Sequence, residues 1–425
     1  MDGLKPSGSI KRIKGGFNMV NKEKNKDLIA DENIFEKVNK LNKFEKELNL
    51  YFIGLNTVIK DSLLAILIKE HILLEGKPGT AKSQLAKTII NNIRGAKVFQ
   101  IQLSKFMPED YVFGSININK LKNEGVIYHN TENSIVESDF AFIDEFFDGS
   151  DVLLRSLLEI LNERTFTRNK QKLESKLNSA FLTSNYKREN AETEAILDRI
   201  LFKHNIKPVE DLSSLKEILG IYLKNIKNSK SEKDLNEVKY NGYIRFKYED
   251  QIEFEELKTL QDYLFEVNIN VNLQNKYLRL VKEFSRQTGK YISTRIINKG
   301  VKVLMAGALM DLRKNVNTKD FYLLKSVFTE NLQQGLLFDT LVESVNVYTD
   351  DDYVLADKLY NLQKEFDSLK DLNNEEDIKE FIDKLVEFRD KEMYKSNVRI
   401  LIDTFDGLYQ EANIVLHNLL EKQKV

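Results

Sequence analysis

The stretch of sequence that decides the fold is HILLEGKPGTAKSQLAKTIINN, residues 71–92. An apolar run comes first, a glycine-rich turn follows, and a pattern of helical spacing begins at Lys82 and Ser83. The turn, GKPGTAKS (residues 76–83), fits the phosphate-binding frame G-x-x-x-x-G-K-[ST], except that Ala81 replaces the second glycine. The stretch therefore predicts a strand, a phosphate-binding loop and a helix, in that order.

Each part of this frame has a chemical task. Gly76 and Gly79 allow successive backbone N–H groups to turn inward around a polyphosphate, and the helix that follows points its positive end at the same charge. Lys82 is expected to reach the β- and γ-phosphates, and Ser83 to offer its hydroxyl to Mg²⁺. We therefore expect ATP and Mg²⁺ as cofactors, although a turn that merely joins a strand to a helix is the alternative. The other loop residues expected to bind the nucleotide are Lys77, Pro78, Thr80, Ala81 and Gln84.

Bulk composition limits the class of protein. A chain of 425 residues is too long for one core, so two or three domains are expected. With 42% hydrophobic and 31% charged residues it is an ordinary soluble globular chain, and a net charge of -2 gives no global reason to expect nucleic acid or a membrane as partner. The absence of cysteine excludes disulfides and thiolate metal sites, and it favours a cytoplasmic setting.

Polar residues follow two further apolar stretches of the chain. Three stretches predict strands: VFQIQL (98–103) alternates like a strand, while DFAFID (139–144) and SAFLTSN (179–185) are apolar runs. Because residues 151–162 form an amphipathic helical pattern between the last two, we predict an α/β fold with a parallel sheet covered on both faces by helices. Ligands bind at the carboxyl ends of such strands. Asp144, Glu145 and Asn185 all fall there, as does the phosphate-binding loop.

The rest of the chain divides into segments of different character. Residues 34–69 have helical spacing that is broken at 52–56, where Ile53 and Gly54 are expected to flank an adenine. Residues 116–128 look like a projecting hairpin, and the chain after Pro208 is helical in pattern. The predicted helices there are 208–229, 250–267, 272–288, 293–313, 319–330 and a run from 351 to the end. The predicted domains are a disordered basic tail (1–30), an α/β nucleotide-binding domain (31–207), a helical lid (208–335) and a C-terminal helical extension (336–425).

Five polar residues are candidates for catalysis of phosphoryl transfer. Asp144 is suited to hold the magnesium shell, and Glu145 to orient and deprotonate the attacking water. The Asn185 amide could position that water or touch the γ-phosphate, or it could be an ordinary turn residue. Arg199 and Arg295 could each bring positive charge to the γ-phosphate, although single arginines usually make surface ion pairs.

The order of these motifs resembles that of the AAA+ ATPases, and the sequence is similar to the MoxR branch and, within it, to the RavA-like proteins. The narrower resemblance is carried by Ala81 before Lys82, PEDYVFGSI (108–116) and LLEILNERTF (157–166). It covers residues 34–330, with residues 116–128 similar to the family's helix-2 insert. The resemblance implies these roles: nucleotide binding for Lys82 and Ser83, magnesium binding and water activation for Asp144 and Glu145, sensor 1 for Asn185, arginine finger for Arg199 and sensor 2 for Arg295.

The resemblance implies an ATPase that remodels or activates partner proteins in the manner of a chaperone. It implies a homo-hexameric ring whose sites are completed by Arg199 of the neighbouring subunit. It also implies a client or adaptor protein, for which a protein with a von Willebrand-type domain is one candidate. Two alternatives remain open: a motor or loader acting on nucleic acid, and a nucleotide-gated scaffold with weak hydrolysis. Basic residues that the motor needs are sparse outside Lys120, Lys122 and the N-terminal tail.

Overall fold

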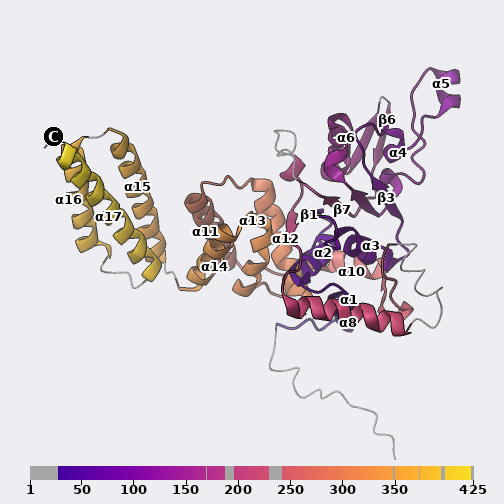
Figure 1. Ribbon diagram of the computed structural model, residues 1–425, viewed down its shortest axis with the longest axis horizontal. Helices are drawn as coiled ribbons and strands as arrows, with labels where there is room; N and C mark the ends of the chain where they lie inside the picture. The colour runs from indigo at the N-terminus through magenta and orange to yellow at the C-terminus, as the bar shows by residue number, and fades with distance from the viewer. Residues whose placement is uncertain are drawn as a thin grey trace, which may run out of the picture. The chain divides into compact units, whose positions relative to one another are not determined.

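The computed structural model describes residues 27–168, 170–186, 196–228, 242–347, 350–372, 374–393 and 398–422 (Figure 1). The predicted basic tail, residues 1–30, lies outside these residues except for its last four. The chain forms two compact units. One contains Met1–Asn270 and Asn298–Val316, and the other contains Val271–Ile297 and Asn317–Val425.

A five-stranded parallel sheet forms the centre of the first unit. Its strand order is β3 (Val98–Gln102), β4 (Phe140–Asp144), β7 (Ser179–Ser184), β1 (Ile72–Gly76) and β8 (Phe202–Ile206). The predicted α/β fold is therefore confirmed. Since all five strands are parallel, their carboxyl ends lie on the same side of the sheet. Strand β7 lies between β4 and β1, so the ends of these three strands are neighbours.

Helices cover both faces of this sheet. Figure 1 shows α2 (Asn56–Leu67) and α3 (Lys82–Asn91) on one side and α6 (Asp151–Glu163) on the other. Successive side chains of a strand point to opposite faces of the sheet, so each strand packs against helices on both sides. Leu73, Ile143 and Leu182 belong to the buried cluster that includes Leu157 of α6. On the opposite face, the ring of Phe142 lies under the ammonium group of Lys87 from α3.

The predicted break in the first helical run is also confirmed. Helix α1 (Glu32–Tyr51) precedes α2, and Asp31 caps it by accepting hydrogen bonds from the N–H groups of Asn33 and Ile34. Its apolar residues recur at helical spacing and are buried: Ile34, Val38, Leu41, Phe44 and Leu48. The break between the helices leaves Ile53 and Gly54 in a turn.

The hairpin predicted for residues 116–128 is wrong. The structure has a short helix there, α5 (Ile118–Glu124), and the only pairing nearby that it describes is one antiparallel bridge between Ile116 and His129. Asn117 caps the helix by accepting from the N–H of Lys120, and Gly125 ends it with a φ of 66°. These two terminal signals outweigh the strand-like alternation. In Figure 1, α5 stands away from the sheet, and none of its residues is buried.

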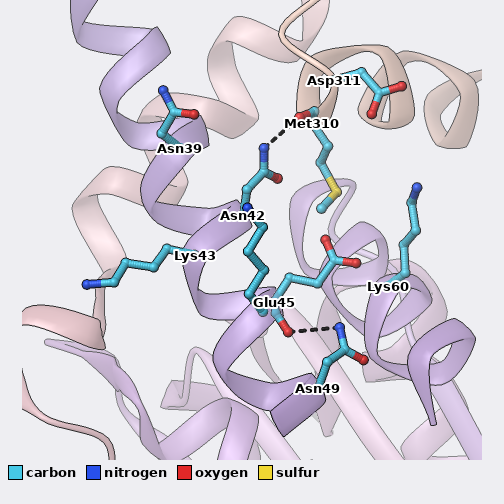
Figure 2. A pocket seen from close by; sticks show the side chains of 9 residues that line it. Asn39, Asn42, Lys43, Glu45, Asn49, Lys60, Met310 and Asp311 are labelled. Carbon is cyan, nitrogen blue, oxygen red and sulfur yellow. Dashed lines mark hydrogen bonds between the residues drawn. The ribbon is translucent and has the colours of Figure 1, made fainter. Parts of the chain in front are cut away.

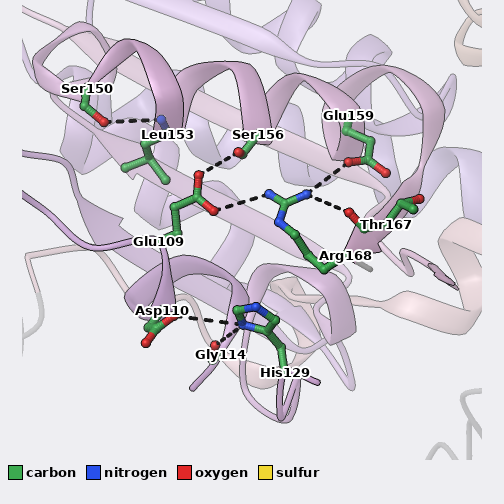
Figure 3. A network of polar contacts seen from close by, with 10 residues as sticks. All are labelled: Glu109, Asp110, Gly114, His129, Ser150, Leu153, Ser156, Glu159, Thr167 and Arg168. Carbon is green, nitrogen blue, oxygen red and sulfur yellow. Dashed lines mark hydrogen bonds and ion pairs between the residues drawn. The ribbon is translucent and has the colours of Figure 1, made fainter. Parts of the chain in front are cut away.

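The base of this projection is fixed by a polar network around Arg168 (Figure 3). Arg168 belongs to an antiparallel pair that we did not predict, β5 (Thr165–Arg168) with β6 (Gln171–Glu174). Its guanidinium lies 5.3 and 5.1 Å from the ring centres of Phe113 and Phe166, and it pairs with Glu109 at 3.4 Å and Glu159 at 3.3 Å. The stretches 108–116 and 157–166, two of the three features that carry the narrower resemblance, therefore both contact Arg168.

Helices account for most of the described chain after residue 208, as predicted. They are α8 (Leu212–Asn228), α10 (Phe254–Tyr263), α11 (Val271–Thr288), α12 (Thr294–Met310), α13 (Lys325–Phe328), α14 (Leu332–Val347), α15 (Asp350–Leu372), α16 (Glu375–Lys391) and α17 (Arg399–Lys422). The helix predicted for 319–330 is divided into a 3₁₀ helix, Thr318–Leu324, and the short α13, and α14 was not predicted. The last three helices share a buried core of their own, built around Phe366, Phe381 and Phe405. Within the described residues, no helix is long and apolar enough to cross a membrane.

Candidate active site

Three groups predicted to act together meet at the carboxyl edge of the sheet. Gly76 ends β1, Asp144 ends β4, and Asn185 follows β7, which lies between those two strands. Side-chain contacts join all three groups, as described below. The prediction that the loop, the acidic pair and Asn185 lie close together is therefore consistent with the observed geometry.

Backbone geometry makes the loop specific for small residues. Gly76 has a φ of 152°, and a Cβ on it would lie 2.3 Å from the carbonyl oxygen of Ile206, so only glycine fits. Gly79 has a φ of 83° with open space around it. Ala81 has a φ of 61°, the left-handed region, where a side chain costs roughly 1–2 kcal/mol. The loop therefore keeps the conformation of a glycine at position 81, in spite of the added methyl group.

Lys82 opens α3 and turns back over the loop. Its Nζ donates to the carbonyl oxygens of Gly76 at 2.6 Å and Lys77 at 3.0 Å, and to Oδ1 of Asn185 at 3.2 Å. Burial lowers the pKa of Lys82, while the carboxylates of Glu145 and Asp144 act in the opposite direction. The ammonium group is therefore held at the centre of the loop, where an anionic ligand is its natural partner.

Asp144 lies against α3 and β7. Its Oδ1 accepts hydrogen bonds from the Ser83 hydroxyl at 3.3 Å, from the N–H of Glu145 at 3.1 Å, and from the Thr183 hydroxyl. Ser83 and Asp144 thus present neighbouring oxygen donors, the ligand type that Mg²⁺ prefers. These two residues fit a magnesium ion that keeps most of its waters.

Glu145 shares the left-handed backbone conformation of Ala81. Its φ of 47° lies in the left-handed region, and its Oε1 accepts a hydrogen bond from Nδ2 of Asn185. Burial raises the pKa of Glu145, and the negative charges of Asp144 and Asp148 raise it further. Asn185 therefore links the loop lysine to this carboxyl group through the two ends of one amide.

The turn between α1 and α2 lies near the same edge. A Cβ built on Gly54 would be 3.9 Å from Cγ2 of Val209, three residues after the end of β8. Ile206 at that end pairs with Gly76. Ile53 is partly buried and Gly54 is exposed, so this turn offers a small apolar flank close to the loop.

Arg199 lies near the amino ends of the strands, on the side of the sheet opposite to the phosphate-binding loop. Phe202, three residues later, pairs with Ile72 at the start of β1, whereas Gly76 is at its end. A strand advances about 3.3 Å per residue, so the start of β1 at Ile72 and its end at Gly76 are about 13 Å apart. The carbonyl oxygen of Arg199 accepts from Nζ of Lys299 at 3.4 Å. The structure therefore does not bring Arg199 to the loop of its own chain.

Arg295 belongs to the other compact unit. It lies in the first turn of α12 and is exposed. The Ser293 hydroxyl accepts from the N–H of Ile296 at 3.4 Å, as a residue that caps the start of a helix does. The role of Arg295 stays a prediction.

Sequence reasoning placed Thr183 in the polar end of the stretch SAFLTSN but assigned it no role. It stands two residues before Asn185 in a strand whose residues are all buried, and its hydroxyl reaches Asp144. The available signal was a hydroxyl group in a mostly apolar strand. Thr183 lies two residues after the buried Phe181, so both side chains point to the same face of the sheet.

A separate hollow of about 370 Å³ lies between α1, α2 and the end of α12 (Figure 2). Its lining is mostly polar: Asn39, Asn42, Lys43, Glu45, Lys46, Asn49, Lys60, Met310 and Asp311. Burial raises the pKa of Glu45, with Lys60 opposing and Asp311 adding to the shift. None of the strand-end residues lines it, so it is distinct from the loop described above.

Comparisons with known proteins agree with this geometry. Residues 39–241 match the family model of the MoxR domain in the MoxR-vWA-beta-propeller ternary systems. An uncharacterized protein of Methanocaldococcus jannaschii is 29% identical over 361 residues, which span 84% of this chain and 88% of its own. A second uncharacterized protein of that organism is 28% identical over 288 residues, spanning 68% of this chain and 71% of its own.

A solved structure shows the same fold. It is that of a protein from Cytophaga hutchinsonii described provisionally as an ATPase, with a TM-score of 0.54 and 21% sequence identity. The alignment covers 76% of this chain and 97% of that one. At this level of identity the likeness concerns the fold alone.

Proposed function

We infer that this chain is an AAA+ ATPase of the MoxR family, which binds ATP with Mg²⁺ and hydrolyses it to ADP and phosphate; the match of residues 39–241 to the MoxR-domain family model supports this. The observation that carries the inference is the set of contacts at the carboxyl edge of the sheet. Lys82 contacts Asn185, which contacts Glu145, while Ser83 contacts Asp144. The groups that we propose to bind phosphate, to activate water and to hold magnesium therefore contact one another.

Each group has a defined part in the proposed reaction. The N–H groups of the loop and the ammonium of Lys82 bind the β- and γ-phosphates, and Ser83 and Asp144 hold the metal. When bound, Mg²⁺ neutralises charge on the phosphate oxygens. Glu145 takes the proton of the attacking water, and the Asn185 amide keeps its carboxylate in place. The proposal includes one further cation, Arg199 of a neighbouring subunit, to stabilise the charge that develops on the γ-phosphate.

Lys82→Ala tests nucleotide binding. Removing a charged hydrogen-bond donor is expected to cost roughly 1.5–3 kcal/mol, or about 10- to 100-fold in ATP affinity. Titration calorimetry with a slowly hydrolysed ATP analogue measures the change. The matched control is Lys87→Ala on the same helix, whose ammonium lies 4.9 Å from the Phe142 ring and away from the loop. If Lys82→Ala binds the analogue as tightly as the unmodified chain, Lys82 has no role in nucleotide binding.

We further propose that hydrolysis drives remodelling or activation of partner proteins by a cytoplasmic homo-hexamer, as a RavA-like member of the family would do. The family model describes ternary systems with vWA and beta-propeller proteins, which supports a partner carrying a von Willebrand-type domain. The sequences of stretches 108–116 and 157–166, which both contact Arg168, resemble the RavA-like proteins and support that part of the proposal. Helix α5, exposed along its whole length, is a suitable element for contact with a client.

The helices α15, α16 and α17 are proposed to serve partner binding or assembly rather than nucleotide binding. They share a core of their own, and none of the predicted nucleotide residues lies in them. A chain ending at residue 349 is therefore expected to remain soluble and to bind the ATP analogue with unchanged affinity in calorimetry. Sedimentation with and without nucleotide then reports whether assembly depends on these helices. A soluble truncated chain that no longer binds nucleotide would show that the helices belong to the ATPase fold.

A further inference from the structure

We propose that Thr183 is a positioning residue that orients the carboxylate of Asp144 toward the metal. The proposal rests on the ATPase function inferred above and deepens it, because it assigns a role to a residue outside the phosphate-binding loop, the acidic pair and Asn185. Thr183 lies in β7, next to β4, and is fully buried. Its hydroxyl donates to Oδ1 of Asp144.

The direction of the side chain follows from the strand pattern. Successive residues of a strand point to opposite faces, so Thr183 shares the face of Phe181 while Ser184 points the other way. Asp144 likewise shares the face of Phe142, where α3 packs. Thr183, Asp144 and Ser83 of α3 therefore converge in one layer between the sheet and the helix. Ser184 instead donates to the carbonyl oxygen of Tyr186 at 2.6 Å.

The hydrogen bonds decide which oxygen of Asp144 serves the metal. Oδ1 receives the hydroxyl of Thr183, the hydroxyl of Ser83 and the N–H of Glu145. These donors occupy the acceptor capacity of Oδ1, so Oδ2 is the oxygen that can face the water shell of Mg²⁺. Ser83 is expected to offer its hydroxyl to the metal, and the donor of Glu145 is its backbone N–H. Thr183 is fixed in a central strand, and it therefore sets the rotation of the carboxylate about its Cβ–Cγ bond.

Replacing the hydroxyl by a methyl group isolates this effect. Thr183→Val keeps the shape of the side chain and removes the donor, and loss of such an outer contact typically costs 10- to 100-fold in metal affinity. We expect the Mg²⁺ concentration that half-saturates tight binding of a fluorescent ATP analogue to rise by about this factor. Affinity for the analogue in EDTA should stay unchanged. Thr183→Ser, which keeps the hydroxyl, should retain the original Mg²⁺ dependence.

Ser184→Ala is the matched control, because it removes a buried hydroxyl from the neighbouring position of the same strand without touching Asp144. It should leave the Mg²⁺ dependence unchanged. If the unmodified chain fails to bind the analogue, or binds it without regard to Mg²⁺, the proposed function is wrong. If the unmodified chain requires Mg²⁺ and Thr183→Val has the same requirement, the role of Thr183 is wrong. A raised Mg²⁺ requirement in Thr183→Ser would also overturn it, and this outcome can be read even where the valine variant folds poorly.

Discussion

Glu145→Gln is expected to lower the kcat for ATP hydrolysis by about 10²- to 10⁴-fold, the usual contribution of a general base, with ATP affinity retained. The glutamine side chain keeps an oxygen that can accept the hydrogen bond from Nδ2 of Asn185, so the geometry of the site survives. It cannot take the proton of the attacking water. Phosphate release measures turnover, and calorimetry with ATP measures binding. Turnover close to that of the unmodified chain would remove Glu145 from the mechanism.

The pH dependence of the reaction provides a second test of Glu145. The residue acts as a base only when deprotonated, and burial raises its pKa above the ordinary 4.5, with Asp144 and Asp148 adding to the shift. The kcat should therefore fall as the pH drops through a value above 4.5. Asp148→Asn is the matched control, because it removes a neighbouring charge without removing the base. It should keep turnover at neutral pH and move the acidic limb of the profile to lower pH.

Arg199→Ala is expected to reduce kcat by about 10³- to 10⁵-fold, the range for an arginine that stabilises transferring phosphate charge. Arg199 lies near the amino ends of the strands, whereas the loop lies at their carboxyl ends. We therefore expect Arg199 to act on the site of a neighbouring subunit. A contact that repeats from head to tail must close into a ring or continue as a filament. The test is to mix Arg199→Ala, whose own loop is intact, with Lys82→Ala, whose Arg199 is intact.

Recovered ATPase activity in the mixture, absent from either variant alone, supports an arginine supplied in trans. Arg199→Lys distinguishes charge from geometry, since lysine keeps the charge and loses the planar fork that binds phosphate oxygens in pairs. The alternative is that Arg199 makes an ion pair in a monomer. Full activity of Arg199→Ala by itself, or an active species that sediments as a monomer with ATP at all concentrations, would decide for that alternative.

The elements that the sequence predicted correctly have signals confined to a few neighbouring residues. Strands β4 and β7, which end at Asp144 and Ser184, each contain an apolar run and are buried along almost their whole length, as expected for strands covered on both faces. The phosphate-binding loop is specified by its glycines, and Gly76 cannot be replaced because Ile206 lies against it. These features need no knowledge of distant parts of the chain, so a single sequence reveals them.

The missed elements depend on partners far away in the chain. Strand β8 (FKHNI) lies at the edge of the sheet, and its central residues are polar, so the sequence lacks the apolar run. Its His204 lies 3.0 Å from buried Asp61 of α2, which explains a polar residue at that place. Thr183 was assigned no role for a similar reason. Its importance comes from Asp144, 39 positions earlier, and only the strand pairing brings the two together.

The methyl group of Ala81 leaves the left-handed conformation of the loop in place, but we expect it to change the thermodynamics of nucleotide binding. A glycine at this position would sample many conformations in the free protein, and ordering it around phosphate would cost conformational entropy at the moment of binding. Alanine, already held at a φ of 61°, has fewer conformations to lose. The cost is moved from binding to folding, so nucleotide association with this chain should carry a smaller entropic penalty than association with a loop that has glycine there.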